Sequence, residues 1–280
     1  MRPVGSAFKF AELSGNLRIY GKYKQSNLSS DGCISSQIRI FTGEQAFMSD
    51  YRNSIPGRFT QTTTAAARNQ VMRNTYWLLA LSLIPTVLGS AVGLYSGLNQ
   101  VMAGSPGLTI IVFLVGAFGL MYAIEKNKNS SAGVGLLLLF TFFMGVMLSR
   151  MLGFVLGMGN GAQLVMLAFG GTAAVFGTMA TLASSVKRDL SNMQKFLFMG
   201  VVVIILAAVA NIFLQLPALM ITISVLAIGI FSAFLLIDLQ RVINGGETNY
   251  VSATLAIYLD LYNIFANLLA LLGIFGGSRE

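Results

Sequence analysis

The sequence predicts an all-α integral membrane protein, built as a bundle of seven transmembrane helices. Of its 280 residues, 55% are hydrophobic and only 10% are charged, whereas soluble domains carry about 25% charged residues. The apolar residues form long runs of the length that crosses a bilayer as a helix. The basic residues of the intervening loops alternate between the two ends of these runs, which is typical of multi-pass membrane proteins.

Each apolar run is expected to form one membrane-spanning helix. In chain order the expected helices are Thr75–Leu98, Leu108–Ile124, Ala132–Leu152, Gln163–Ala183, Phe196–Leu214, Ala218–Arg241 and Tyr250–Phe275. Only a few residues around Pro217 separate the fifth from the sixth. A single helix over 196–241 would be about 69 Å long, roughly twice a bilayer, so we expect two crossings. Glycines of the third and fourth helices are read as ordinary close packing between helices.

The positions of lysine and arginine predict the topology. Basic residues lie in the N-terminal tail, between helices two and three, between helices four and five, and near the turn between helices six and seven. The loops on the other side carry none, apart from Arg150 at the edge of helix three. By the positive-inside rule we expect a cytoplasmic N-terminus and an external C-terminus.

Residues 1–72 are expected to be a polar tail without regular structure, followed by a seven-transmembrane domain over 73–277. Met48 begins a short polar lead into the first helix, so we expect translation to start at or next to it. Residues 1–74 hold ten of the 18 Lys and Arg residues. A basic tail beside a bilayer suits anionic lipid, and without a folded basic domain that interleaves aromatic residues no nucleic acid partner is expected.

Several classes of enzyme are excluded by composition. The chain has no histidine, and Cys33 is its only cysteine. A zinc site of the His/Cys type, a Ser-His-Asp triad and an intrachain disulfide are therefore ruled out. No P-loop, dinucleotide-binding fingerprint or lysine in helix seven is present. We accordingly expect no catalytic site and no cofactor.

Two carboxylates in the last two helices are the candidate functional site. Asp238 and Asp260 flank a turn at Gly245-Gly246, and a lone charge inside a membrane costs roughly 3 kcal/mol or more. Their depths from the turn are about 9 and 13 Å, so antiparallel neighbours can bring the two carboxyl groups together. Two carboxyl groups that close rarely ionise together, so the pair is expected to hold a proton and respond to pH. For Asp238 a local ion pair with Arg241 remains an alternative.

Helix seven carries a polar face around the deeper carboxylate. Asp260, Asn263 and Asn267 recur at i, i+3 and i+7, which puts them on one side of the helix. This face is expected to point into the bundle, with Asn263, Asn267 and Arg241 supporting the pair.

The stretch IDLQRVINGGETNYVSATLAIYLDLYNIFANLLALLG resembles the C-terminal signature of the transmembrane Bax inhibitor motif (Bax inhibitor-1) family. RNTYWLLALSLIPT at the first helix, NIFLQLPAL before the sixth and GGETNY at the turn resemble its bacterial YccA-like branch. The resemblance spans about Arg73 to Gly277. It implies a seven-helix bundle in a bacterial inner membrane, with the last helix near the centre.

The resemblance also implies a function for the aspartate pair. Members of the family are associated with a pH-sensitive calcium leak governed by two aspartates, whose motif positions Asp238 and Asp260 occupy. The YccA-like branch is linked to restraint of a membrane-anchored AAA protease. Some relatives latch the pair with an arginine on helix two, but Leu108–Ile124 contains no basic residue, so either Arg241 replaces it or no residue does.

Three functions therefore remain open. The first is a proton-gated calcium or cation leak, and the second is a non-conducting modulator of a membrane-anchored AAA protease. The third, an intramembrane aspartyl protease, is disfavoured because Asp260 lies in LYLDLY and lacks the GxGD context of those enzymes.

Overall fold

The computed structural model describes residues 57–98, 102, 104–186, 190 and 192–276. The chain divides into two compact units, Met1–Gln61 and Thr62–Glu280. The fold described below is that of the second unit, together with residues 57–61, which begin its first helix. Met48 and the proposed start of translation lie outside the described residues.

Seven α-helices run through the described residues, each long and apolar enough to cross a membrane. They are α3 (Gly57–Tyr95), α5 (Pro106–Asn127), α6 (Ser131–Leu156), α7 (Gly161–Ser185), α8 (Met193–Leu214), α9 (Pro217–Asn244) and α10 (Tyr250–Gly276). The all-α seven-helix class expected from the sequence is confirmed. The fifth and sixth crossings are separate helices, because Gln215 takes a left-handed conformation (φ 50°) and Pro217 starts the next helix.

The first helix is longer than expected. It begins at Gly57, so residues 57–72 are helical, whereas the sequence placed them in a tail without regular structure. Ala65, Ala66 and Ala67 are strong helix formers, and no proline interrupts the chain between residues 58 and 84. Residues 65–70 are exposed, which shows that this turn of helix is supported by backbone propensity and not by packing.

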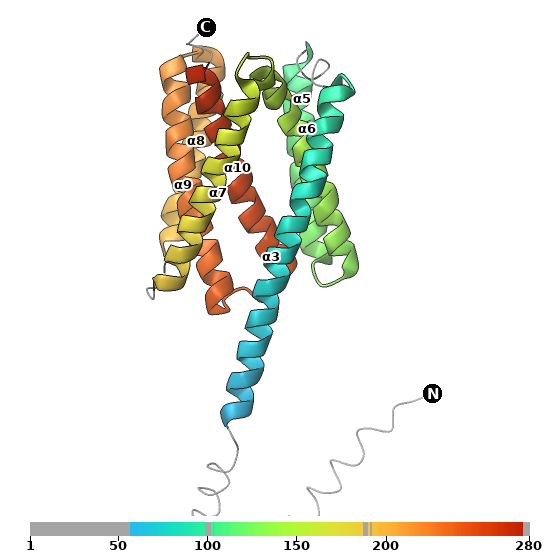
Figure 1. Ribbon diagram of the computed structural model, residues 1–280, viewed down its shortest axis with the longest axis vertical. Helices are drawn as coiled ribbons and strands as arrows, with labels where there is room; N and C mark the ends of the chain where they lie inside the picture. Colours follow the sequence, from blue (N-terminus) through green and yellow to red (C-terminus); the bar gives the residue numbers. More distant parts are fainter. Residues whose placement is uncertain (1–56, 99–101, 103, 187–189, 191, 277–280) are drawn as a thin grey trace, which may run out of the picture. The chain divides into compact units, whose positions relative to one another are not determined.

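Helix α10 is the centre of the bundle. It packs against α9, α7, α6 and α5, and Figure 1 shows it running between α7 and α9 on one side and α3 and α6 on the other. Ile257, Ile264 and Leu269 on α10 are fully buried. The side of α10 that carries these three residues therefore lies inside the protein and away from lipid.

Helices α3 and α6 cross at very short range. A Cβ atom placed on Gly145 would lie 2.1 Å from the carbonyl oxygen of Thr86. Van der Waals contact between backbones drives helix association in lipid, and here it fixes the wall of the bundle that faces one side of α10.

Helix α8 lies at the periphery. It packs against α9, and none of its residues is buried. Its apolar side chains are therefore free to face lipid or a membrane partner.

Candidate functional site

The turn between α9 and α10 brings the two aspartate-bearing helices together. Gly245 has a positive φ of 76°, a conformation that glycine adopts without steric cost. The N–H of Gly246 donates to the carbonyl oxygen of Arg241 at 2.8 Å, which closes the end of α9. Asn249 then starts α10, because its Oδ1 accepts the N–H of Val251 at 2.9 Å. This sharp reversal makes the two helices antiparallel neighbours.

The structure brings Asp238 and Asp260 together, as the depth argument anticipated. Their carboxyl groups lie within reach of a side-chain hydrogen bond. Both are largely withdrawn from solvent, with 13% of the Asp238 side chain and 5% of Asp260 exposed. A hydrogen bond between two carboxyl groups requires one proton, so this geometry suits a pair that shares one.

The two carboxylates have unequal surroundings. Asp238 has a cation beside it, since Nη1 of Arg241 lies 3.8 Å from its Oδ1. Arg241 also extends Nη2 to within 3.9 Å of Oε2 of Glu247 in the turn. Asp260, in contrast, has a buried Oδ2 with no hydrogen-bond partner among the described residues. A buried oxygen without a donor is costly, so Asp260 is the less satisfied member of the pair.

Arg241 is therefore the cation that the structure places beside the pair, and it comes from the same helix as Asp238. Helix α5 carries Lys126 in its last turn and no basic residue along Leu108–Ile124. The hypothesis that Arg241 replaces a helix-two arginine is compatible with this geometry and stays a prediction.

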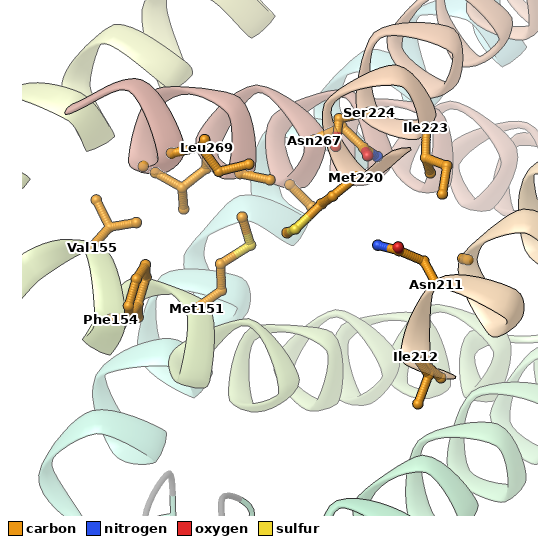
Figure 2. Close-up of a pocket in the computed structure, with 15 residues that line it drawn as sticks. Met151, Phe154, Val155, Asn211, Ile212, Met220, Ile223, Ser224, Asn267 and Leu269 are labelled. Carbon is orange, nitrogen blue, oxygen red and sulfur yellow. The ribbon is translucent and has the colours of Figure 1, made fainter. Parts of the chain in front are cut away.

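The two asparagines of the polar face do not bind the carboxylates. Nδ2 of Asn263 donates to the carbonyl oxygen of Leu259 at 2.8 Å, and Nδ2 of Asn267 donates to that of Asn263 at 2.8 Å. No hydrogen bond joins either amide to the aspartate pair within the residues that the structure describes. Both side chains are half-buried. Asn267 instead lines a pocket further along α10 (Figure 2).

A second polar face of α10, which the sequence analysis missed, faces α3 and α6. The hydroxyl of Tyr258 lies 2.9 Å from Oγ1 of Thr86 on α3. The hydroxyl of Tyr262 donates to the carbonyl oxygen of Met144 at 3.4 Å. The hydroxyl of Thr254 donates to the carbonyl oxygen of Tyr250 on its own helix at 2.6 Å and lies 3.4 Å from the carbonyl oxygen of Thr75 on α3. Hydroxyl-bearing residues recur every four residues, at positions 254, 258 and 262, so they share one side of the helix. This spacing is the sequence pattern from which the second polar face could have been predicted.

A third group of polar residues ties the two turns at the same end of the bundle. Nδ2 of Asn249 donates to the carbonyl oxygen of Lys128 at 3.1 Å and to Oδ1 of Asn129 at 2.8 Å. The hydroxyl of Ser252 donates to Oε2 of Glu125 at 3.0 Å, and Glu125 pairs with Lys128. These contacts hold the α5–α6 turn against the start of α10.

The aspartate pair does not by itself form a resident metal site. Calcium takes six to eight oxygen ligands, and two carboxyl groups supply four oxygens at most. Among the described residues no cluster of three Asp, Glu, His or Cys side chains has the geometry of a metal centre.

Comparison with known proteins identifies the relatives of this chain. The family model described as "Inhibitor of apoptosis-promoting Bax1" matches residues 68–277. A relative from Escherichia coli K12, named "Modulator of FtsH protease YccA", is 39% identical over 211 residues, which cover 75% of this chain and 93% of the relative. The corresponding "Inner membrane protein YccA" of E. coli O6:H1 shows the same identity and coverage. An uncharacterized protein of Neisseria meningitidis serogroup A is 39% identical over 215 residues, 76% of this chain and 95% of the relative.

Proposed function

Because this chain belongs to the Bax inhibitor-1 family, we propose that it modulates a membrane-anchored AAA protease of the FtsH type in the bacterial inner membrane. The observation that carries this proposal is the E. coli relative named as a modulator of FtsH protease, 93% of whose length aligns with this chain. The function requires no catalysis by the chain itself.

The α5–α6 and α9–α10 turns, called the tied turns here because hydrogen bonds join them, offer a contact surface for such a partner. Asn249, Lys128 and Asn129 lock the α9–α10 and α5–α6 turns into one polar surface. The positive-inside rule predicts that this end is cytoplasmic, so it would meet the cytoplasmic part of a membrane-anchored protease. The apolar surface of α8, none of which is buried, is available to a transmembrane partner in the bilayer.

A reconstitution experiment tests this function. Purified chain and E. coli FtsH are placed together in proteoliposomes, and the degradation of a fluorescently labelled membrane-protein substrate is followed with ATP. We expect the chain to slow degradation, and equal amounts of an unrelated seven-helix protein to have no effect. Equal degradation rates with this chain and with the unrelated protein would overturn the proposal.

A second candidate function is a pH-sensitive calcium or cation leak. The observation that favours it is the buried pair itself, in which Asp260 retains an oxygen without a partner beside Asp238. Protonation would remove a charge at the α9–α10 contact and bias the packing of the two helices. Purified protein in liposomes loaded with a calcium dye tests this across pH 6 to 8, and the absence of calcium entry at every pH would leave only the protease reading.

A further inference from the structure

A pocket of about 480 Å³ opens at the end of the bundle opposite the α9–α10 turn. Four helices line it: α6, α8, α9 and α10. Helices α6 and α8, which form facing walls, do not contact one another in the described part of the chain. Its volume falls in the range of small-molecule sites, about 300–1,000 Å³.

The lining is apolar apart from three polar side chains. Figure 2 shows Asn211 reaching from α8 into the space, with Ser224 and Asn267 across from it. Met151, Phe154 and Val155 of α6 make the opposite wall apolar. The pocket therefore has an apolar side and a side that can form hydrogen bonds.

Ser224 is the observation that points to a ligand. It is only 3% exposed, and its hydroxyl has no hydrogen-bond partner among the described residues. Ser232, two turns further along the same helix, shows the ordinary alternative, because its hydroxyl donates to the carbonyl oxygen of Ile228 at 2.6 Å. Buried hydroxyls are nearly always bonded in this way. A free hydroxyl lining a pocket is available to an occupant.

Asn211 supplies a second free donor. Its Oδ1 accepts the N–H of Leu216 at 3.0 Å, which leaves the Nδ2 group for another partner. Asn267 differs, since its Nδ2 already donates to Asn263 and its Oδ1 is left as an acceptor. The pocket thus presents two donors from α8 and α9 to a ligand with an acceptor oxygen.

These donors lie near one end of the bundle. Asn211 is three residues from the end of α8, about 4.5 Å along the axis. Ser224 is seven residues from the start of α9, about 10 Å along the axis. Acyl carbonyl groups lie at the border between hydrocarbon and headgroups, near the ends of transmembrane helices, so a lipid chain in the pocket would bring its carbonyl group to the same end of the bundle.

The mouth of the pocket favours an apolar chain that enters from the bilayer. Phe154 and Ile212, which line the pocket, are 68% and 58% exposed, so the pocket opens toward the lipid-facing surface of the bundle. Met151 and Met220 are flexible side chains that adapt to an irregular apolar ligand.

We propose that this pocket binds one long-chain fatty acyl group, whose carbonyl oxygen accepts hydrogen bonds from Ser224 and Asn211. The apolar chain lies against α6 and the small residues of α10. The site is independent of the aspartate pair and of any protease, so its test does not depend on the proposed function.

Photo-crosslinking of the purified full-length protein tests the proposal. Three probes carry the same diazirine: palmitic acid, a phosphatidylcholine with a palmitoyl chain, and hexadecane, which lacks a carbonyl. We expect saturable labelling of the segments 208–224 and 266–274 by a carbonyl-bearing probe. The free acid and the phospholipid separate the two sources of the acyl group. Equal labelling by hexadecane, or labelling spread evenly over all helices, would refute the site.

Two variants and a matched control sharpen the test. Ser224→Ala removes one neutral hydrogen bond and should weaken the apparent affinity for the labelled probe about threefold to tenfold. Ala270→Phe fills the pocket and should abolish saturable labelling. Ser232→Ala, on the same helix but outside the pocket, should leave labelling unchanged. Unchanged affinity in Ser224→Ala, or unchanged labelling in Ala270→Phe, would overturn the proposal.

Discussion

Nη1 of Arg241 lies 3.8 Å from Oδ1 of Asp238, one turn earlier on the same helix. The other aspartate of the pair has no cation partner among the described residues, and its Oδ2 is buried without a donor. The two facing carboxyl groups are therefore not equivalent, and replacing each should have a different effect on stability.

Asp260→Asn is expected to leave the free energy of unfolding unchanged or to raise it. The new amide has the same shape, carries no charge, and can donate to the Asp238 carboxylate. Asp238→Asn loses a long, partly exposed ion pair with Arg241 and should cost about 1 kcal/mol or less. Thermal unfolding of both variants in the same detergent measures the difference. A larger loss of stability in Asp260→Asn than in Asp238→Asn would contradict this view of the site.

Gly145→Ala should destabilise the bundle by about 1–3 kcal/mol, because the new methyl group would lie 2.1 Å from a backbone oxygen of α3. Gly135→Ala on the same helix is the control, since a Cβ there meets nothing within 4 Å. Thermal unfolding of the two variants makes the comparison. Similar stabilities would show that α3 and α6 do not approach as closely as the structure places them.

Asn249→Ala should cost about 1–2 kcal/mol through the loss of the α10 cap and of the bonds to Lys128 and Asn129. Thr248→Ala changes an exposed neighbour and should have little effect. Hydrogen exchange of the first turn of α10 provides a local measurement. We expect faster exchange in Asn249→Ala and not in Thr248→Ala. Unchanged exchange in Asn249→Ala would show that Asn249 does not stabilise the start of α10.

Membrane topology gives a further prediction. A reporter that is active only in the cytoplasm, fused after Glu280, should be inactive if seven crossings start from a cytoplasmic N-terminus. The same reporter inserted in the α5–α6 turn at Asn129 should be active. An active fusion after Glu280 would invert the topology and place the tied turns outside.

The fold was readable from the sequence because its main determinant, helix-length apolar runs, is local. The separation of α8 from α9 followed from length alone, and the start of α10 at Tyr250 is that of the expected helix. The extension of α3 back to Gly57 was missed, since hydropathy detects where a helix leaves the apolar region and not where its backbone stops being helical.

The candidate site was predictable only in part. Charged residues are rare in membrane-spanning segments and are therefore easy to recognise in the sequence. Asp238 and Asp260 could accordingly be paired from their distances to one turn. The Tyr258–Thr86 contact joins residues 172 positions apart, and no local pattern specifies which helix α10 faces on that side. The pocket at Ser224 depends on four helices at once and on a hydroxyl that does not bond its own backbone, neither of which a sequence displays.

Asp260→Asn should abolish the pH dependence of calcium flux if the leak function is correct. The substitution removes the titratable proton and preserves shape, so it separates charge from packing. Asp238→Asn should change the same pH dependence, because the two groups are coupled. The double variant should do little more than Asp260→Asn alone, since coupled sites are not additive. Flux into dye-loaded liposomes at pH 6 to 8 is the measurement, with Asn263→Ala as a control on the same face. Normal pH dependence in Asp260→Asn would rule out gating by the pair.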